Sequence, residues 1–254
     1  MTPRRLHRNA GAGPGCTCPD IQTVNSTTAT SEDDMSTTET TDVDTPFSAR
    51  IREATMTAHR DAERSSYVHR LMRGQLPIDG VADLMVQHHA IYTSLERTAD
   101  VLDADPVVGA FLGPELLRVP RIEADLRHLV GNDWATRFGV RPATAEYAGT
   151  IAATAAHPER FAAQHYTRIM GDLSGGQMIR RTLERHYGDA IAGALSFYDF
   201  DIEDVDVYKD QYRTRLDLAP WSDAERDAFI DETNRAYSSN ASVFGELDVA
   251  WSGD

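Results

Sequence analysis

Two short stretches of the chain carry residues whose types and spacing could support chemistry. In "TAHRDAE", His59 and Glu63 stand four positions apart, so a helix places both on one face. A neutral imidazole is a common metal ligand, and a carboxylate beside it can accept the other ring N–H and fix the tautomer. In "GDLSGGQ", residues 171–177, an aspartate and three glycines interrupt what otherwise reads as one long helix.

The letters "LSGGQ" match the signature of ATP-binding-cassette ATPases, but the sequence does not support that function. A phosphate-binding loop needs a lysine directly after its glycines, whereas Lys209, the only lysine, follows "VDVY". Each glycine inside a helix costs about 1 kcal/mol relative to alanine. Glycines let a backbone approach a flat ligand closely, and Asp172 disfavours an anionic ligand at this place. A hinge or a close helix crossing is the alternative interpretation.

The spacing of apolar residues predicts an all-α fold, with one compact domain of roughly eight helices over residues 46–250. Helices are expected over 46–72, 79–104, 113–131 (one or two helices, broken at Pro120) and 144–156. The long interrupted helix follows Pro158, the next helix stops before Pro220, and the last one opens with Ser222 as its N-cap. Residues 1–45 are rich in Thr, Ser, Gly and Asp, which predicts a disordered tail.

Charge and composition favour some classes of protein over others. The net charge of −15 and the pI of about 4.9 disfavour a nucleic-acid partner. No apolar run reaches the ~18 residues of a membrane span, and "MTPRRLHRNAGAGPG" lacks the apolar core of a signal peptide. Cys16 and Cys18 both lie in the tail, so the predicted domain has no disulfide. These features predict a cytoplasmic protein without a membrane partner; whether translation starts at Met1 or Met35 stays open.

Five segments, in the same order along the chain, resemble the heme oxygenase family. "EATMTAHRDAE" is similar to its proximal helix, and "HYTRIMGDLSGGQMIRRTL" closely resembles its distal helix. The others are "RGQLPIDGVADLM" with "IYTSLE", "YKDQYRTRLD" and "NASVFGEL". The resemblance implies that heme b is sandwiched between the proximal helix and a kinked distal helix. It also implies that heme, as both substrate and cofactor, is cleaved to biliverdin, CO and ferrous iron by O2 and electrons from an external donor, such as a ferredoxin or a flavoprotein reductase.

The resemblance also assigns roles to individual residues of the two helices. His59 is expected to ligate the iron, with Glu63 as the partner of its ring. Asp172 is expected to hold an ordered water that hydrogen-bonds the bound dioxygen and supplies a proton to it. The expected catalytic residues are Asp172, Arg168 and Tyr92, and the expected distal contacts to heme are Gly171, Ser174 and Gly175.

Further positions match the edge and the pocket of the family's site. Arg52, Lys209 and Arg213 match contacts to the heme propionates, and Tyr166 could add a hydrogen bond. Tyr237 and Asn240 match positions of the distal pocket. Met56 stands where the family carries a second basic residue, so one propionate contact is expected to be weaker. The biliverdin isomer therefore stays open, with the α isomer as the default.

Other interpretations of the same residues remain. His88, His89, His128 and His165 are rival ligands, although none aligns with the ligand position. A non-catalytic heme carrier would share His59 but would not need Asp172. A thiamin-degrading enzyme of similar architecture needs a cysteine nucleophile, which the predicted domain lacks. A di-iron oxidase needs Glu-x-x-His pairs, and the chain contains none.

Overall fold

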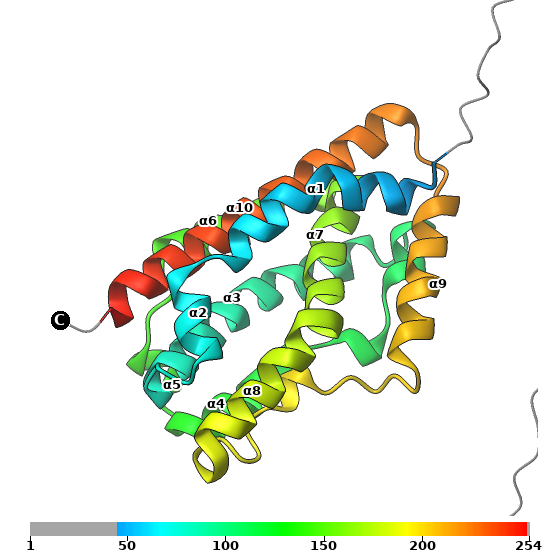
Figure 1. Ribbon diagram of the computed structural model, residues 1–254. Helices are drawn as coiled ribbons and strands as arrows, with labels where there is room; N and C mark the ends of the chain where they lie inside the picture. The colour runs from blue at the N-terminus through cyan, green and yellow to red at the C-terminus, as the bar shows by residue number, and fades with distance from the viewer. Residues whose placement is uncertain (1–44, 253–254) are drawn as a thin grey trace, which may run out of the picture. The chain divides into compact units, whose positions relative to one another are not determined.

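The computed structural model describes residues 45–252, and the elements formed by these residues are all helical. Figure 1 shows their arrangement. The α-helices are α1 (Phe47–Glu63), α2 (Ser66–Met72), α3 (Ile78–Leu102), α4 (Val119–Val130), α5 (Trp134–Arg137), α6 (Pro142–Ala153), α7 (Pro158–Gly171), α8 (Gln177–Tyr187), α9 (Val205–Leu218) and α10 (Asp223–Trp251). Short 3-10 turns are η1 (Val108–Phe111), η2 (Pro114–Leu116), η3 (Thr154–Ala156), η5 (Gly188–Ala190) and η6 (Ser196–Tyr198). The predicted all-α fold is confirmed.

The long helix α10 is the element on which the two helices with candidate site residues meet. Both α1 and α7 pack against it, and α6 lies along another part of its length. Helix α3 packs against α4 and α6, and it also reaches α7. In Figure 1, α1 runs alongside α10 while α7 crosses behind it. The fold therefore connects the "TAHRDAE" helix to the "GDLSGGQ" helix through α10.

Local sequence signals set most helix ends, with two departures from expectation. The Ser222 N-cap of α10 is confirmed, because its hydroxyl accepts from the Glu225 N–H while Glu225 Oε2 accepts from the Ser222 N–H at 2.8 Å. The single helix predicted over residues 46–72 is wrong: Ser65 caps a separate α2 by accepting from the Val68 N–H. The stretch 113–131 forms two short helices, η2 and α4, as expected, but the break falls between Leu116 and Val119 rather than at Pro120. This proline lies in the first turn of α4, where its missing N–H costs no hydrogen bond.

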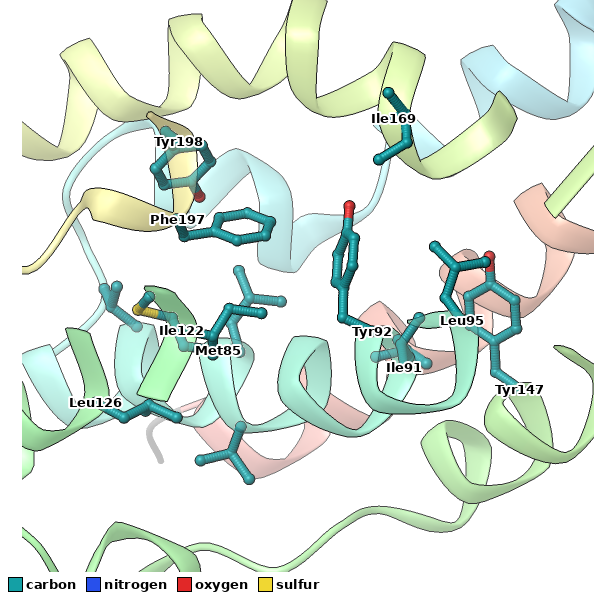
Figure 2. Close-up of a cluster of buried hydrophobic side chains, with 14 of the residues drawn as sticks. Met85, Ile91, Tyr92, Leu95, Ile122, Leu126, Tyr147, Ile169, Phe197 and Tyr198 are labelled. Carbon is teal, nitrogen blue, oxygen red and sulfur yellow. The ribbon is translucent and has the colours of Figure 1, made fainter. Parts of the chain in front are cut away.

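Two clusters of buried side chains hold the helices together. The larger one is drawn in part in Figure 2 and joins α3, α4, α6 and the loop after α8. The smaller one is aromatic and joins α1, α9, η1 and α10 through Phe47, Phe111, Tyr212, Trp221 and Phe229. Because Ser48 also donates to Asp217 through its backbone N–H at 2.7 Å, the start of α1 is held against the end of α9.

A buried histidine joins α7 to α9 and makes stability depend on pH. His165 Nδ1 lies 2.9 Å from the Tyr212 hydroxyl, and the two rings stack. Burial lowers the pKa of His165 to about 4, whereas a histidine in the unfolded chain titrates near 6.5. Between these values the unfolded state binds a proton that the folded state does not. Stability is therefore complete above pH ~6.5 and falls as the pH decreases toward 4.

We expect this histidine to remove about 3 kcal/mol of unfolding free energy between pH 6.5 and pH 4. His165→Gln should flatten the pH dependence measured by urea denaturation of the heme-free protein. His88 is also buried, and its lowered pKa acts in the same direction, so some dependence should remain. The exposed His157 provides the control, because His157→Gln should leave the dependence as it is. An unchanged slope in His165→Gln would contradict the assignment.

Residues 1–44 lie outside the described residues. The predicted disordered tail, the two cysteines and the question of Met35 as a start all fall there. Among residues 45–252, no helix is both long enough and apolar enough to cross a membrane.

Candidate active site

The predicted interruption of the long helix is a π-helical turn, η4 (Asp172–Gly176), between α7 and α8. Such turns widen a helix by one residue and are frequent at functional sites. Gly171, Ser174 and Gly175 lie exposed on one face, and a Cβ added at either glycine would meet no atom within 4 Å. Gly176 is buried, and a Cβ there would lie 3.2 Å from the Tyr198 ring. The open face is therefore made by two of the three glycines, as the sequence predicts.

The carboxylate of Asp172 points into the protein and meets two predicted partners. Its Oδ2 accepts a hydrogen bond from the Tyr92 hydroxyl, and its Oδ1 lies 4.0 Å from Arg168 Nη2. The Arg168 guanidinium also lies 5.0 Å from the centre of the Tyr92 ring. In Figure 2 the Tyr92 hydroxyl points from α3 toward the helix that carries Ile169. Burial raises the pKa of Asp172, and Arg168 and Tyr92 oppose that rise.

The structure adds Tyr147, which the sequence analysis did not single out. It lies on α6, is fully buried, and its hydroxyl has no hydrogen-bond partner among the described residues. Burial raises the pKa of Tyr147 to about 12, and Arg168 opposes that rise. Arg168 Nε and Nη2 are also buried without hydrogen-bond partners in residues 45–252. Unpaired buried donors of this kind are the usual partners of ordered water. Nothing in "TAEYAGT" marks this tyrosine, since only the packing of α6 brings it here.

His59 lies on the exposed face of α1, with its side chain 47% exposed. Its Nδ1 lies 3.6 Å from Glu63 Oε2, so the predicted pair forms and Nε2 stays available for a ligand. The Tyr237 ring approaches His59 edge-on, with 5.3 Å between ring centres. That Tyr237 belongs to the distal pocket stays a prediction. Tyr237 and Asn240 are three positions apart on α10 and so share a face of that helix, where Tyr237 contacts His59 and Asn240 accepts from Arg168 Nη1 at 2.9 Å.

The rival histidines have other surroundings. His88 is buried against Phe197, and His165 is buried against Tyr212. His89 Nε2 lies 3.2 Å from Glu123, and the His128 ring lies beside Gly193. A buried ring without an open side cannot bind a large planar ligand, which supports His59 over His88 and His165.

The cations expected at the heme edge lie on two helices that pack together, Arg52 on α1 and Lys209 and Arg213 on α9. Burial raises the pKa of Tyr166 on α7, and the charges of Arg213 and Arg52 oppose that rise. Arg213 Nη1 also binds Asp210 at 2.6 Å. Lys209 Nζ binds Asp206 at 2.7 Å, so its charge is directed to a neighbour on its own helix. Met56 is exposed at the position that departs from the family's pattern.

The sequence profile of heme oxygenases matches residues 45–246. The chain belongs to the heme oxygenase family. It is 32% identical to the heme oxygenase of Pyropia yezoensis over 201 residues, which cover 78% of this chain and 84% of that protein. Among solved structures, it is similar to heme oxygenase-1 of the cyanobacterium Synechocystis in complex with heme. That match has a TM-score of 0.77 and 28% identity and covers 82% of this chain and 94% of the other.

A third match supports the same assignment. The heme oxygenase of Leptospira interrogans has 29% identity and a TM-score of 0.75, covering 80% of this chain and all of that one. This heme oxygenase therefore binds heme and degrades it to biliverdin, CO and iron. Family membership decides against the non-catalytic carrier and the thiamin-degrading enzyme. Family membership likewise decides against the di-iron oxidase.

The residues of the site fit heme as the substrate. An exposed imidazole on α1 offers a ligand atom. The face of Gly171, Ser174 and Gly175 offers a surface on which no Cβ stands in the way of a flat ring. Arg52 and Arg213 can meet two carboxylates at one edge. Behind the open face, unpaired donors of Arg168 and Tyr147 leave capacity for water.

Proposed function

We propose that His59 binds the heme iron through Nε2 and that Glu63 orients its ring. The two side chains are four residues apart on α1, and 3.6 Å separates Nδ1 from Oε2. A carboxylate in this position can accept a hydrogen bond from Nδ1–H once the two side chains close the 3.6 Å gap, which leaves the Nε2 lone pair free for the iron. The edge of the Tyr237 ring limits rotation of the imidazole from the α10 side.

We propose that Asp172 holds the distal proton network, with Tyr92 and Arg168 as its partners. Heme, once bound and reduced, supplies the site where dioxygen is activated. The chain supplies a buried carboxylate whose Oδ2 is occupied by Tyr92 and whose Oδ1 lies 4.0 Å from Arg168. Oδ1 can therefore accept a hydrogen bond from a water on the open face of η4. Arg168 is itself held by Asn240, so the carboxylate and its water keep one position.

One observation supports a heme site between α1 and α7 more than any other. On α10, Tyr237 contacts the proposed ligand His59, and Asn240, three residues later, contacts Arg168 of the distal helix. Three residues of helix rise about 4.5 Å. The proximal and distal groups therefore meet neighbouring positions of one rigid helix, which suits a ligand gripped from two sides.

We propose that Arg52, Arg213 and Tyr166 bind the heme propionates, with Lys209 contributing after it leaves Asp206. Arg52→Ala and Arg213→Ala should each weaken heme binding about fivefold, and the double variant about 20-fold, because each removes a partly screened charge pair. Heme titration followed by the Soret band measures this effect. Arg50 on the same helix is the control, since it pairs with Asp227 instead. Wild-type affinity in the double variant would contradict the assignment.

Opening heme with O2 consumes electrons, which we propose come from a second protein. We propose a ferredoxin or a flavoprotein reductase as the donor, with O2 as the oxidant and the cytoplasm as the location. The chain has no cysteine after residue 18, which suits a reducing compartment. We further propose that residues 46–250 carry the whole activity.

Turnover tests the proposed function directly. The heme complex is supplied with O2 and either a ferredoxin with its reductase or a flavoprotein reductase. We expect loss of the Soret band, release of CO and formation of biliverdin, with the α isomer identified by chromatography. A stable oxygen complex that yields no bilin with either donor would contradict the proposal.

A further inference from the structure

The segment Ser196–Phe200, here called the clasp, lies beside the distal turn and is held firmly by its neighbours. Asp125 on α4 is buried, and its carboxylate accepts from the Ser196 N–H at 3.0 Å, the Ser196 hydroxyl at 2.7 Å and the Phe197 N–H at 2.7 Å. Three hydrogen bonds to one carboxylate fix the start of the clasp against α4.

Arg118 holds the other side of the clasp. Its side chain is fully buried, and Nη1 donates to the carbonyl oxygens of Phe197, at 3.0 Å, and Asp199. Its guanidinium lies 4.0 Å from the centre of the Phe200 ring. The backbone N–H of Arg118 donates to Glu96 on α3 at 2.6 Å. The clasp backbone is thus bound from both sides and has little freedom to shift.

The clasp touches the distal site at two places. The Phe197 ring packs edge-on against Tyr92, with 5.5 Å between ring centres, and Figure 2 shows Phe197 between Tyr198 and Tyr92. Tyr198 covers the buried Gly176, where an added Cβ would lie 3.2 Å from Tyr198 Cδ1 and 3.6 Å from Asp172 Cβ. Gln177 Nε2 also donates to the Tyr198 carbonyl at 2.7 Å. The clasp therefore contacts Tyr92 through Phe197, and it contacts the turn that carries Asp172 through Tyr198 and Gln177.

We propose that the clasp is a positioning element for Asp172, with Tyr198 and Gly176 as the contact through which it acts. The hydrogen-bonded clasp backbone fixes the position of the Tyr198 ring, and this position limits how closely the π turn can pack against the clasp. Gly176, which has no side chain, allows the turn to pack directly against the ring. A Cβ at position 176 would lie 3.2 Å from Tyr198 Cδ1, so the ring and the turn must separate by a few tenths of an ångström. Because the clasp backbone is hydrogen-bonded on both sides, we expect the turn to move and the Asp172–Tyr92 hydrogen bond to weaken. The effect on catalysis rests on the proposed role of Asp172. The packing of Gly176 against Tyr198 does not depend on that role.

A double-mutant cycle tests the contact in two ways. In heme-free protein, Gly176→Ala should speed amide hydrogen exchange across residues 172–176 at least tenfold. In the heme complex it should reduce the biliverdin formed per heme consumed about tenfold, with heme affinity changed less than threefold. Tyr198→Ala removes the ring that Cβ would meet. In the Tyr198→Ala background, Gly176→Ala should therefore change either measurement less than twofold.

Gly245→Ala on α10 is the matched control, because a Cβ there has open space, and it should alter neither measurement. Equal effects of Gly176→Ala with and without Tyr198 in the exchange experiment would overturn the positioning role. A normal biliverdin yield in Asp172→Asn would instead overturn the proposed role of Asp172. The exchange cycle in heme-free protein separates these two failures.

Discussion

Asp172→Asn is expected to reduce biliverdin formation at least 100-fold while heme binding changes less than threefold. Asparagine keeps the size of the side chain but carries no charge, so it can hold neither Arg168 nor a proton-donating water in the same way. Losing a positioned proton donor typically costs 10²–10⁴-fold in rate. The carboxylate is buried beside Tyr92 and Arg168 and is assigned no contact with heme, so its loss should spare affinity.

The measurement is single-turnover reaction of the heme complex, with biliverdin, CO and hydrogen peroxide quantified together. We expect reducing equivalents to appear as peroxide or as oxidised heme in the variant. Asp210→Asn is the control, because Asp210 is an exposed carboxylate on α9 that contacts Arg213 rather than the distal network. A biliverdin yield within twofold of the wild type would remove Asp172 from the mechanism.

The second large effect concerns the iron ligand. His59→Ala should abolish the absorption spectrum of a histidine-ligated heme and lower turnover at least 100-fold, because no neighbouring imidazole can take its place. His88 and His165 are buried, and burial lowers the pKa of both rings without giving them an open side. Added imidazole should fill the space left by the side chain and restore much of the spectrum.

The matched control for the ligand is His157→Ala, which removes another exposed histidine near Glu159 and should leave the spectrum unchanged. Glu63→Gln gives a finer readout, since it should keep the ligand but shift the iron–imidazole stretching frequency. If His59→Ala showed the wild-type spectrum without added imidazole, another residue would be the ligand.

The helical fold could be predicted from contiguous residues. Ser222 and Glu225 form the expected capping box, and Pro220 ends the preceding helix within two residues of its last turn. Ser65 shows the limit, because a single cap splits a stretch whose apolar spacing continues across it. A helix cap depends on a single side chain. The spacing of apolar residues is judged over about ten or more positions, so it does not reveal one capping residue.

The site was predictable where its residues are close in sequence. His59 and Glu63 pair because helix geometry brings positions i and i+4 together. Gly171 and Gly175 predict a helix face without side chains, and their Cβ positions are open. Their family resemblance then suggested the remaining partners. Only the family resemblance set Gly171 and Gly175 apart from Gly176, and the structure gives the physical difference: Gly176 lies against Tyr198, whereas the Cβ positions of the other two are open.

The sequence alone therefore determined the helices, their interruption at residues 171–177 and the chemistry of an imidazole paired with a carboxylate. Only the tertiary structure decided that the unpaired Tyr147 hydroxyl is buried within the influence of Arg168, that Tyr237 lies beside His59, and that the clasp packs against Tyr92 and the distal turn. The physical reason is that local hydrogen bonds and helix periodicity are set by neighbours along the chain. Contacts such as Arg168 with Asn240, 72 residues apart, depend instead on the directions in which packed helices cross.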